Sequence, residues 1–288
     1  MVTRPDILVL GGGGRQGDSW MTGVLAGLED ARGISFADCD YFVGTSAGAI
    51  VATKLAGERR LHRPSERAGA VSGGQSPVPN WAANAAMAIA APFALLGVRL
   101  GTLPGELARS AVLRVVPTSA TDTLDFHGAF PPSSVRFDGR LRVVAVERLS
   151  GKRVVFGAPG APQATVEQAL TASCSLPLVF SPAVIAGREY VDGATWSPTN
   201  ADVAPATREA HVLILAPMAS LHGPFHKGVR ALSRAAMLLE VSALKARGVR
   251  VRIITPDRDS ARSTGRDLMS RDGLRETLAA GYQQGLGL

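Results

Sequence analysis

A serine between two glycines, in the pentapeptide GTSAG at 44–48, is the residue whose setting most directly suggests covalent chemistry. It follows an apolar run that predicts a strand and opens a run that predicts a helix, which is the context of a nucleophilic serine on a sharp turn. Gly44 and Gly48 relieve crowding at such a turn, and the helix N-terminus stabilises negative charge on the Ser46 oxygen. The same pattern also fits a serine that only caps a helix. Ser46 therefore needs partners to be a nucleophile.

A run of four glycines at 11–14 lies between a predicted strand and a predicted helix. Consecutive glycines leave backbone N–H groups uncovered at the positive end of a helix dipole, which suits a phosphate or an oxyanion. Gly12, Gly14 and Gly17 also satisfy GxGxxG, the pattern of dinucleotide-binding folds. That fingerprint requires an acidic residue at the end of the second strand, where this chain has the serine motif. The sequence favours an oxyanion loop, with a nucleotide site and a structural turn as alternatives.

Two kinds of side chain could act as the base that a nucleophilic serine requires. Asp192 follows a predicted strand, and Gly193 lets the backbone turn sharply there. A carboxylate with an ordinary pKa of about 3.9 is a weak base at neutral pH, but burial beside a serine would raise that pKa. His222 and His226 would instead give the chain order Ser–Asp–His of α/β-hydrolases, although Ser46 comes early for that fold. Both bases stay open at this point, as does an ordinary Asp-Gly turn at 192–193.

Strand-like and helix-like runs alternate along most of the chain, which predicts an α/β fold with a mainly parallel sheet covered by helices on both faces. The patterns predict strands over 6–10, 41–43, 141–146, 153–156, 188–191, 211–215 and 249–254, and helices over 21–28, 46–56, 165–173, 225–247 and 271–283. Residues 59–134 break the alternation. We expect them to form a cap-like insertion within one domain that spans 1–288.

The composition, with 46% hydrophobic and 19% charged residues, indicates a globular chain that can bury a core without disulfides or metals. Cys39 and Cys174 lie outside any metal-binding pattern, so we expect buried thiols, no metal site and a cytoplasmic location. The first ten residues are too short and polar for a signal peptide. An alanine-rich segment at 81–98 barely reaches spanning length, and we expect a buried or interfacial helix there.

The formal net charge of +7 favours approach to anionic surfaces. Aromatic residues make up only 5% of the chain, so we expect no base-stacking platform and no nucleic-acid partner. Peripheral contact with an anionic membrane is the remaining expectation from charge. Nothing in the sequence indicates a protein partner.

Three strings, GGGGRQG, GTSAG and DGA, resemble in the same order the motifs of the patatin-like phospholipase family. The stretch that leads to the aspartate, ASCSLPLVFSPAVIAGREYVDGA, is also similar to the family pattern. The resemblance covers about 7–56 and 166–216, and it implies a three-layer α/β/α fold with a Ser–Asp dyad and no catalytic histidine. It assigns Ser46 as nucleophile and Asp192 as proton acceptor. The implied oxyanion hole consists of the backbone amides around Gly12, Gly13 and Gly14.

The glycine loop departs from the family pattern in one respect. Gln16 stands where the family often has an arginine, and Arg15 lies one position earlier. The spacing from Gly17 to Gly23 is also one residue longer than the commonest pattern. The resemblance therefore assigns no role to an arginine side chain here.

The resemblance implies a serine acyl hydrolase that cleaves lipid acyl esters, of phospholipase A or lysophospholipase type, without a metal or organic cofactor. Its substrate would be a phospholipid or another acyl ester. Two alternatives follow from the residues themselves: an esterase of the α/β-hydrolase type with a Ser–Asp–His triad, and a non-catalytic nucleotide- or membrane-binding protein.

Overall fold

The computed structural model describes residues 3–65, 103–115 and 135–288. Within these ranges the strands are β1 (Ile7–Leu10), β2 (Tyr41–Thr45), β3 (Leu141–Glu147), β4 (Arg153–Phe156), β5 (Ala183–Ile185), β6 (Arg188–Asp192), β7 (His211–Leu215) and β8 (Arg250–Ile254). They form one sheet in the order β5-β6-β3-β2-β1-β7-β8, with β4 paired to β3.

The centre of the sheet is parallel, as predicted, and one side of it is antiparallel. β3, β2, β1, β7 and β8 all run in the same direction. β4 and β6 pair antiparallel with β3, and β5 pairs antiparallel with β6. The sheet is therefore mixed with mostly parallel strands. This antiparallel side carries Asp192, the last residue of β6.

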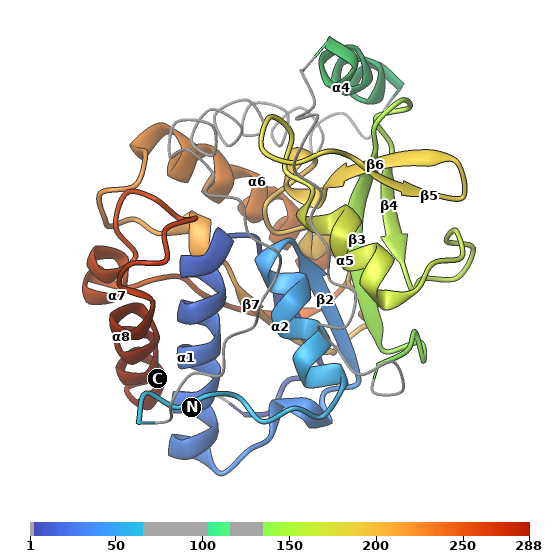
Figure 1. Cartoon of the computed structure of the whole chain (residues 1–288). Helices are drawn as coiled ribbons and strands as arrows, with labels where there is room; N and C mark the ends of the chain where they lie inside the picture. The colour runs from blue at the N-terminus through green and yellow to red at the C-terminus, as the bar shows by residue number, and fades with distance from the viewer. Residues whose placement is uncertain (1–2, 66–102, 116–134) are drawn as a thin grey trace.

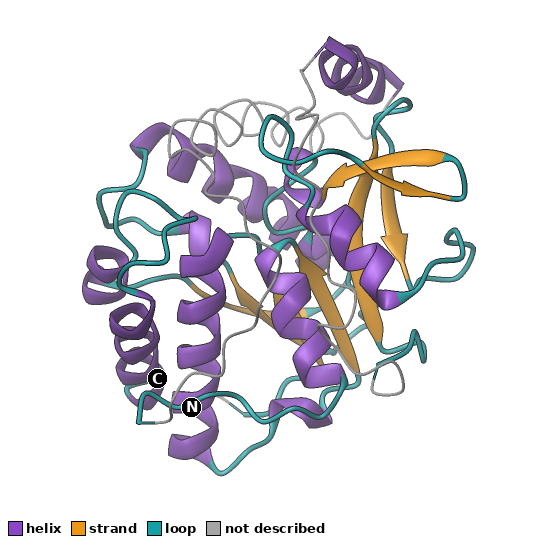
Figure 2. Ribbon diagram, in the orientation of Figure 1, coloured by secondary structure: helices purple, strands orange, loops and turns teal. Residues whose placement is uncertain are grey.

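Helices cover both faces of the sheet (Figures 1 and 2). Their bounds are α1 (Gly14–Arg32), α2 (Ala47–Ala56), α4 (Leu103–Val115), α5 (Val166–Cys174), α6 (Lys227–Ala246), α7 (Arg258–Ser263) and α8 (Leu274–Leu286). Successive residues of a strand point to opposite faces. Accordingly, Leu8 and Leu10 of β1 pack with α1, α2 and α5, whereas Ile7 and Val9 pack with α6. The chain thus has the expected three-layer α/β/α fold.

The C-terminal helix α8 packs closely along α1, which begins at the glycine loop (Figure 1). Two pairs of glycines line the contact, Gly23 and Gly27 on α1 and Gly281 and Gly285 on α8. A Cβ atom on Gly281 would lie 2.6 Å from the carbonyl oxygen of Trp20. Only glycine permits such an approach of two backbones. The last helix is therefore tied to the helix that presents the glycine loop.

Several predicted boundaries agree with the structure. The capping box that opens α5 is formed, because Thr165 and Gln168 exchange hydrogen bonds of 2.9 and 3.2 Å. α6 ends before Gly248, which adopts a left-handed φ of 79°. The last helix begins three residues later than predicted, at Leu274, and neither α7 nor β5 was predicted.

The predicted insertion at 59–134 is described only in part. Residues up to 65 and helix α4 lie within the described ranges, whereas the alanine-rich segment at 81–98 lies outside them. Among the helices that the structure describes, none is both long and apolar enough to cross a membrane.

Candidate active site

Strand β3 brings the ends of two other strands together. Parallel pairing places Thr45, the last residue of β2, opposite Val144. Antiparallel pairing places Asp192, the last residue of β6, opposite Ala145. β4 pairs with β3 from Val143 to Val146, along the edge of β3 that faces away from β2 and β6. β2 and β6 therefore share one edge of β3 and approach each other end to end. Ser46, which follows β2 directly, therefore lies beside Asp192.

The turn that carries Ser46 has the geometry of a strand-to-helix elbow. Ser46 adopts φ 53° and ψ −123°, a backbone conformation that L-residues rarely take and that costs about 1–3 kcal/mol. A Cβ atom on Gly44 would overlap the backbone of Ala49, and one on Gly48 would overlap the carbonyl of Leu10. The two glycines of the motif are thus required by packing around the turn. Helix α2 begins one residue later than predicted, after Ser46.

A second serine, Ser173, holds this turn in place from α5. Its hydroxyl accepts the backbone N–H of Ser46 at 2.9 Å and donates to the carbonyl oxygen of Val144 at 2.7 Å. Ser173 is fully buried. It therefore links the elbow to β3, and sequence reasoning did not single it out.

The Asp192 carboxyl is buried, with 2% of the residue exposed. Burial raises its pKa to about 7, while hydrogen bonding from the Ala194 amide and from the Ser46 hydroxyl opposes part of that rise in pKa. The Ala194 N–H donates to Oδ1 at 2.7 Å, and the Asp192 N–H donates to the carbonyl of Ser175 at 2.9 Å. A Cβ atom on Gly193 would overlap the Val144 carbonyl, so the turn requires glycine. A carboxyl with this pKa is a far better base at neutral pH than an ordinary aspartate.

The glycine loop lies beside Ser46, and its amides differ in their partners. The Gly11 N–H donates to Leu215 at 2.9 Å, and the Gly12 N–H donates to Pro198 at 2.7 Å. A Cβ atom on Gly12 would lie 3.5 Å from Cβ of Ser46. Because the Gly12 amide is engaged, it is not free to bind an oxyanion in this arrangement. The amides of Gly13 and Gly14 have no hydrogen bond to any residue that the structure describes.

Gln16 is buried, and its side chain is hydrogen-bonded to the C-terminal segment. Its Nε2 donates to the carbonyls of Ser270 at 3.2 Å and Asp272 at 2.7 Å, and its Oε1 accepts from Thr277 at 2.7 Å. Its backbone N–H donates to the Leu268 carbonyl at 3.0 Å. The start of α1 is thereby fixed to the C-terminal segment.

The two histidines considered as bases, His222 and His226, are both exposed. Within the described parts of the chain, the groups that act on the Asp192 carboxyl are the Ala194 amide and the Ser46 hydroxyl. A further histidine, His127, lies outside the described residues. Nor do the described residues contain a group of three or more potential metal ligands. The structure thus provides a carboxyl, and neither of these two imidazoles, next to the serine.

Comparison with known proteins identifies a family for most of the chain. The family model described as patatin-like phospholipase matches residues 8–205, a range that holds the glycine loop, the Ser46 elbow and Asp192. No curated protein sequence matches the chain. Among solved structures, the crystal structure of VipD from Legionella pneumophila is similar, with 15% identity and a TM-score of 0.47, covering 99% of this chain and 67% of that one.

Proposed function

Because the chain belongs to the patatin-like phospholipase family, whose members are lipid acyl hydrolases, we propose that it cleaves lipid acyl esters through a dyad of Ser46 and Asp192. The observation that carries this proposal is the end-to-end approach of β2 and β6, which puts a buried carboxyl of pKa about 7 beside a serine on a strained turn. A nucleophile and a base in direct contact satisfy the first requirement of covalent acyl transfer. Neither a metal nor an organic cofactor takes part in this scheme.

In the first half of the reaction, the Ser46 oxygen attacks the ester carbonyl and its proton passes to the Asp192 carboxylate. Collapse of the tetrahedral intermediate breaks the ester bond, and Asp192 returns the proton to the departing alcohol. In the second half, Asp192 takes a proton from water as the water oxygen attacks the acyl-serine. Collapse of this second tetrahedral intermediate breaks the bond between the acyl group and Ser46 and releases the fatty acid, and Asp192 returns the proton to the Ser46 oxygen. Asp192 thus acts first as base and then as acid in each half.

The oxyanion of each tetrahedral intermediate would bind to the uncovered amides of Gly13 and Gly14. Gly12 has a structural role in this proposal, because its amide holds the loop against Pro198. Preorganised donors of this kind are usually the largest contribution to catalysis, and loss of one costs about 3–4 kcal/mol. Gly17 supports the same turn, since its N–H donates to the Gly13 carbonyl at 2.8 Å.

The proposed substrate class is a phospholipid, a lysophospholipid or another acyl ester, reached by peripheral contact with an anionic membrane. The net charge of +7 supports such contact. Sedimentation with vesicles of anionic phospholipid tests it directly. Wild type and the Ser46→Ala variant should sediment equally, and binding only to zwitterionic vesicles, or to none, would contradict this part of the proposal.

Release of fatty acid from phospholipid, lysophospholipid and a simple aryl ester tests the function. Wild type should hydrolyse at least one of these, whereas Ser46→Ala and Asp192→Asn should not. The matched control is the double variant His222→Ala/His226→Ala, which should retain most of the activity. Loss of activity in the double variant would favour the Ser–Asp–His alternative.

A further inference from the structure

The side chain of Asn200 is hydrogen-bonded to a neighbour of each member of the proposed dyad. It lies eight residues after Asp192, is fully buried and adopts a left-handed φ of 52°. Its side-chain amide donates to Oγ1 of Thr45 at 3.1 Å, to the carbonyl of Gly193 at 3.2 Å and to the carbonyl of Ser197 at 2.5 Å, so its two N–H groups are shared among three acceptors. Thr45 directly precedes Ser46, and Gly193 directly follows Asp192. A single side chain therefore spans the gap between the two strand ends.

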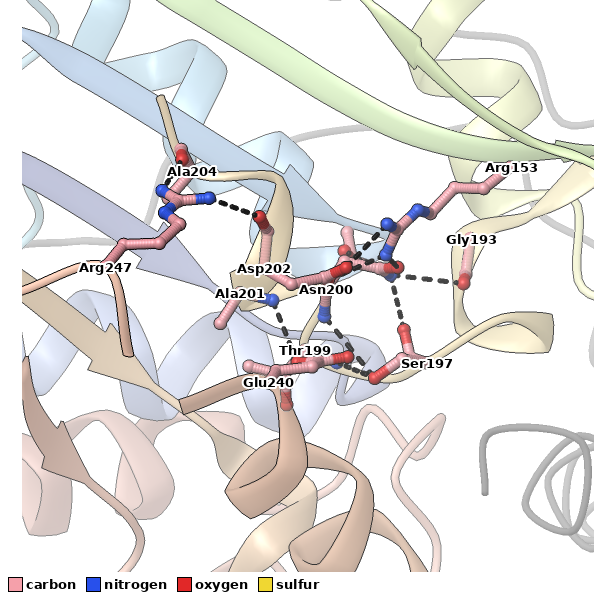
Figure 3. A network of polar contacts seen from close by, with 11 residues as sticks. Arg153, Gly193, Ser197, Thr199, Asn200, Ala201, Asp202, Ala204, Glu240 and Arg247 are labelled. Carbon is pink, nitrogen blue, oxygen red and sulfur yellow. Dashed lines mark hydrogen bonds and ion pairs between the residues drawn. The ribbon is translucent and has the colours of Figure 1, made fainter. Parts of the chain in front are cut away.

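Arg153 fixes which way the Asn200 amide points. Its Nη1 donates to Oδ1 of Asn200 at 3.1 Å (Figure 3). A guanidinium group can only donate, so the oxygen of the amide must face Arg153 and the nitrogen must face the strand ends. Arg153 is itself held by two bonds to Asp202, of 2.7 and 2.6 Å, and lies over the ring of Trp196.

The loop that carries Asn200 is also held from the opposite side. The buried carboxyl of Glu240, on α6, accepts the backbone N–H of Ala201 at 2.8 Å (Figure 3). Arg247, further along the chain, donates to the carbonyl of Ala204 at 3.0 Å. Because the loop is held on both sides, Asn200 cannot shift without breaking several buried hydrogen bonds.

We propose that Asn200 is a positioning residue that sets the separation between the Ser46 hydroxyl and the Asp192 carboxyl. Its side chain is bonded to the residue next to each of them and reaches neither reacting group, so it acts through backbone placement. Displacement of catalytic groups by about 1 Å can lower a rate by about 10²-fold. The inference rests on the proposed function of the dyad.

Glycine is the informative replacement at position 200, because it tolerates a left-handed φ and removes only the side chain. We expect Asn200→Gly to lower kcat for ester hydrolysis by about 10- to 100-fold, because the two groups of the dyad are no longer held at the right separation. KM should change less than about twofold, because the surface that binds substrate is unchanged. The matched control is Arg63→Ala, which removes ion pairs to Glu29 and Asp30 at the end of α1 away from the glycine loop. It should lower the melting temperature and leave kcat unchanged.

Thr45 provides a second, independent test that leaves position 200 intact. Thr45→Ser keeps the hydroxyl that Asn200 binds and should retain activity, whereas Thr45→Val removes it and should lower kcat. The double variant Thr45→Val/Asn200→Gly should be no slower than the worse single variant, because both changes remove the same link. If Asn200→Gly does not fold, the comparison of Thr45→Ser with Thr45→Val still tests the positioning role of Asn200.

Two results would overturn the inference in distinguishable ways. If wild type is active through Ser46, but Asn200→Gly or Thr45→Val keeps its kcat within about twofold, the positioning role is wrong and the dyad stands. If wild type and Ser46→Ala behave alike, the proposed function fails, and the inference fails with it.

Discussion

The hydroxyl of Ser173 accepts the backbone N–H of Ser46 at 2.9 Å and donates to the carbonyl oxygen of Val144 at 2.7 Å. One buried side chain on α5 thus joins the strained elbow to the strand that also aligns Asp192. The elbow needs this support because the conformation of Ser46 is unfavourable by itself.

Replacing Ser173 with alanine should weaken both stability and catalysis. The change leaves the N–H of Ser46 without its acceptor, at a cost of about 1–3 kcal/mol, and frees the turn to move. We expect a lower melting temperature and at least a tenfold loss of kcat. The matched control is Ser175→Ala, at the residue directly after α5, which removes a hydroxyl that donates to the carbonyl of Thr171. It should cost stability without a comparable loss of kcat; equal losses of kcat in both variants would show that Ser173 has no special link to the elbow.

The rate of hydrolysis should follow the ionisation of Asp192. Burial holds its pKa at about 7, and only the ionised carboxyl can accept the serine proton. We expect kcat/KM to rise with pH through about 7 to a plateau. Asp192→Asn should lower kcat by about 10²–10⁴-fold on the plateau and remove this ionisation, so the difference from wild type should narrow as the pH falls below 7. A profile that is flat between pH 5 and 9 would contradict the assignment.

Asp192 should also make folding stability depend on pH. Its pKa is raised from 3.8 to about 7 in the folded state, so at pH below about 4 the carboxyl is protonated whether the chain is folded or not. As the pH rises from 4 to 7 the unfolded chain releases this proton more readily, so the folded state loses stability, and the loss is complete above 7. Asp192→Asn should therefore raise the free energy of unfolding at pH 8 by up to about 4 kcal/mol and change it little at pH 4.

Urea denaturation of wild type and Asp192→Asn at the two pH values measures this difference. Glu240 is a necessary control, because burial raises its pKa from 4.5 to about 7 as well. Glu240→Gln should remove a separate part of the same pH dependence. If Asp192→Asn is no more stable than wild type at pH 8, burial does not destabilise the ionised carboxylate of Asp192.

Gln16 should be required for a rigid glycine loop. Gln16→Ala removes hydrogen bonds to Ser270, Asp272 and Thr277 and leaves the buried Thr277 hydroxyl without this acceptor. We expect a loss of about 2–4 kcal/mol in the free energy of unfolding and a lower kcat. Thr277→Val removes only one of these bonds and should have a smaller effect in the same direction. If Gln16→Ala retains the stability of wild type, the C-terminal segment does not anchor the loop.

The sequence predicted the parts of the site that local patterns encode. Glycines 44 and 48 mark the elbow, Gly193 marks the turn after Asp192, and the capping box at Thr165 marks the start of α5. These features depend on backbone conformation within a few residues, which sequence patterns report well. The alternation of strands and helices along the chain predicted the parallel centre of the sheet.

The residues that join these parts were not predictable from local patterns. Ser173 meets the elbow, and Asn200 meets Thr45, only because β2 and β6 share one edge of β3, a pairing between segments far apart in the chain. Nothing near Gly12 in the sequence indicates that its amide is bonded to Pro198. The start of the last helix was placed too early because the turn before it contains no distinctive N-cap side chain, and Gly273 occupies that position.

Covalent labelling with a fluorophosphonate probe tests the central claim most directly. A dyad of Ser46 and Asp192 predicts one adduct on the folded protein, mapped by mass spectrometry to Ser46. The adduct should be absent in Ser46→Ala and form at least a hundredfold more slowly in Asp192→Asn, while the His222→Ala/His226→Ala control labels at the wild-type rate. An adduct on another residue, no adduct on folded wild type, or undiminished labelling of Asp192→Asn would contradict the account.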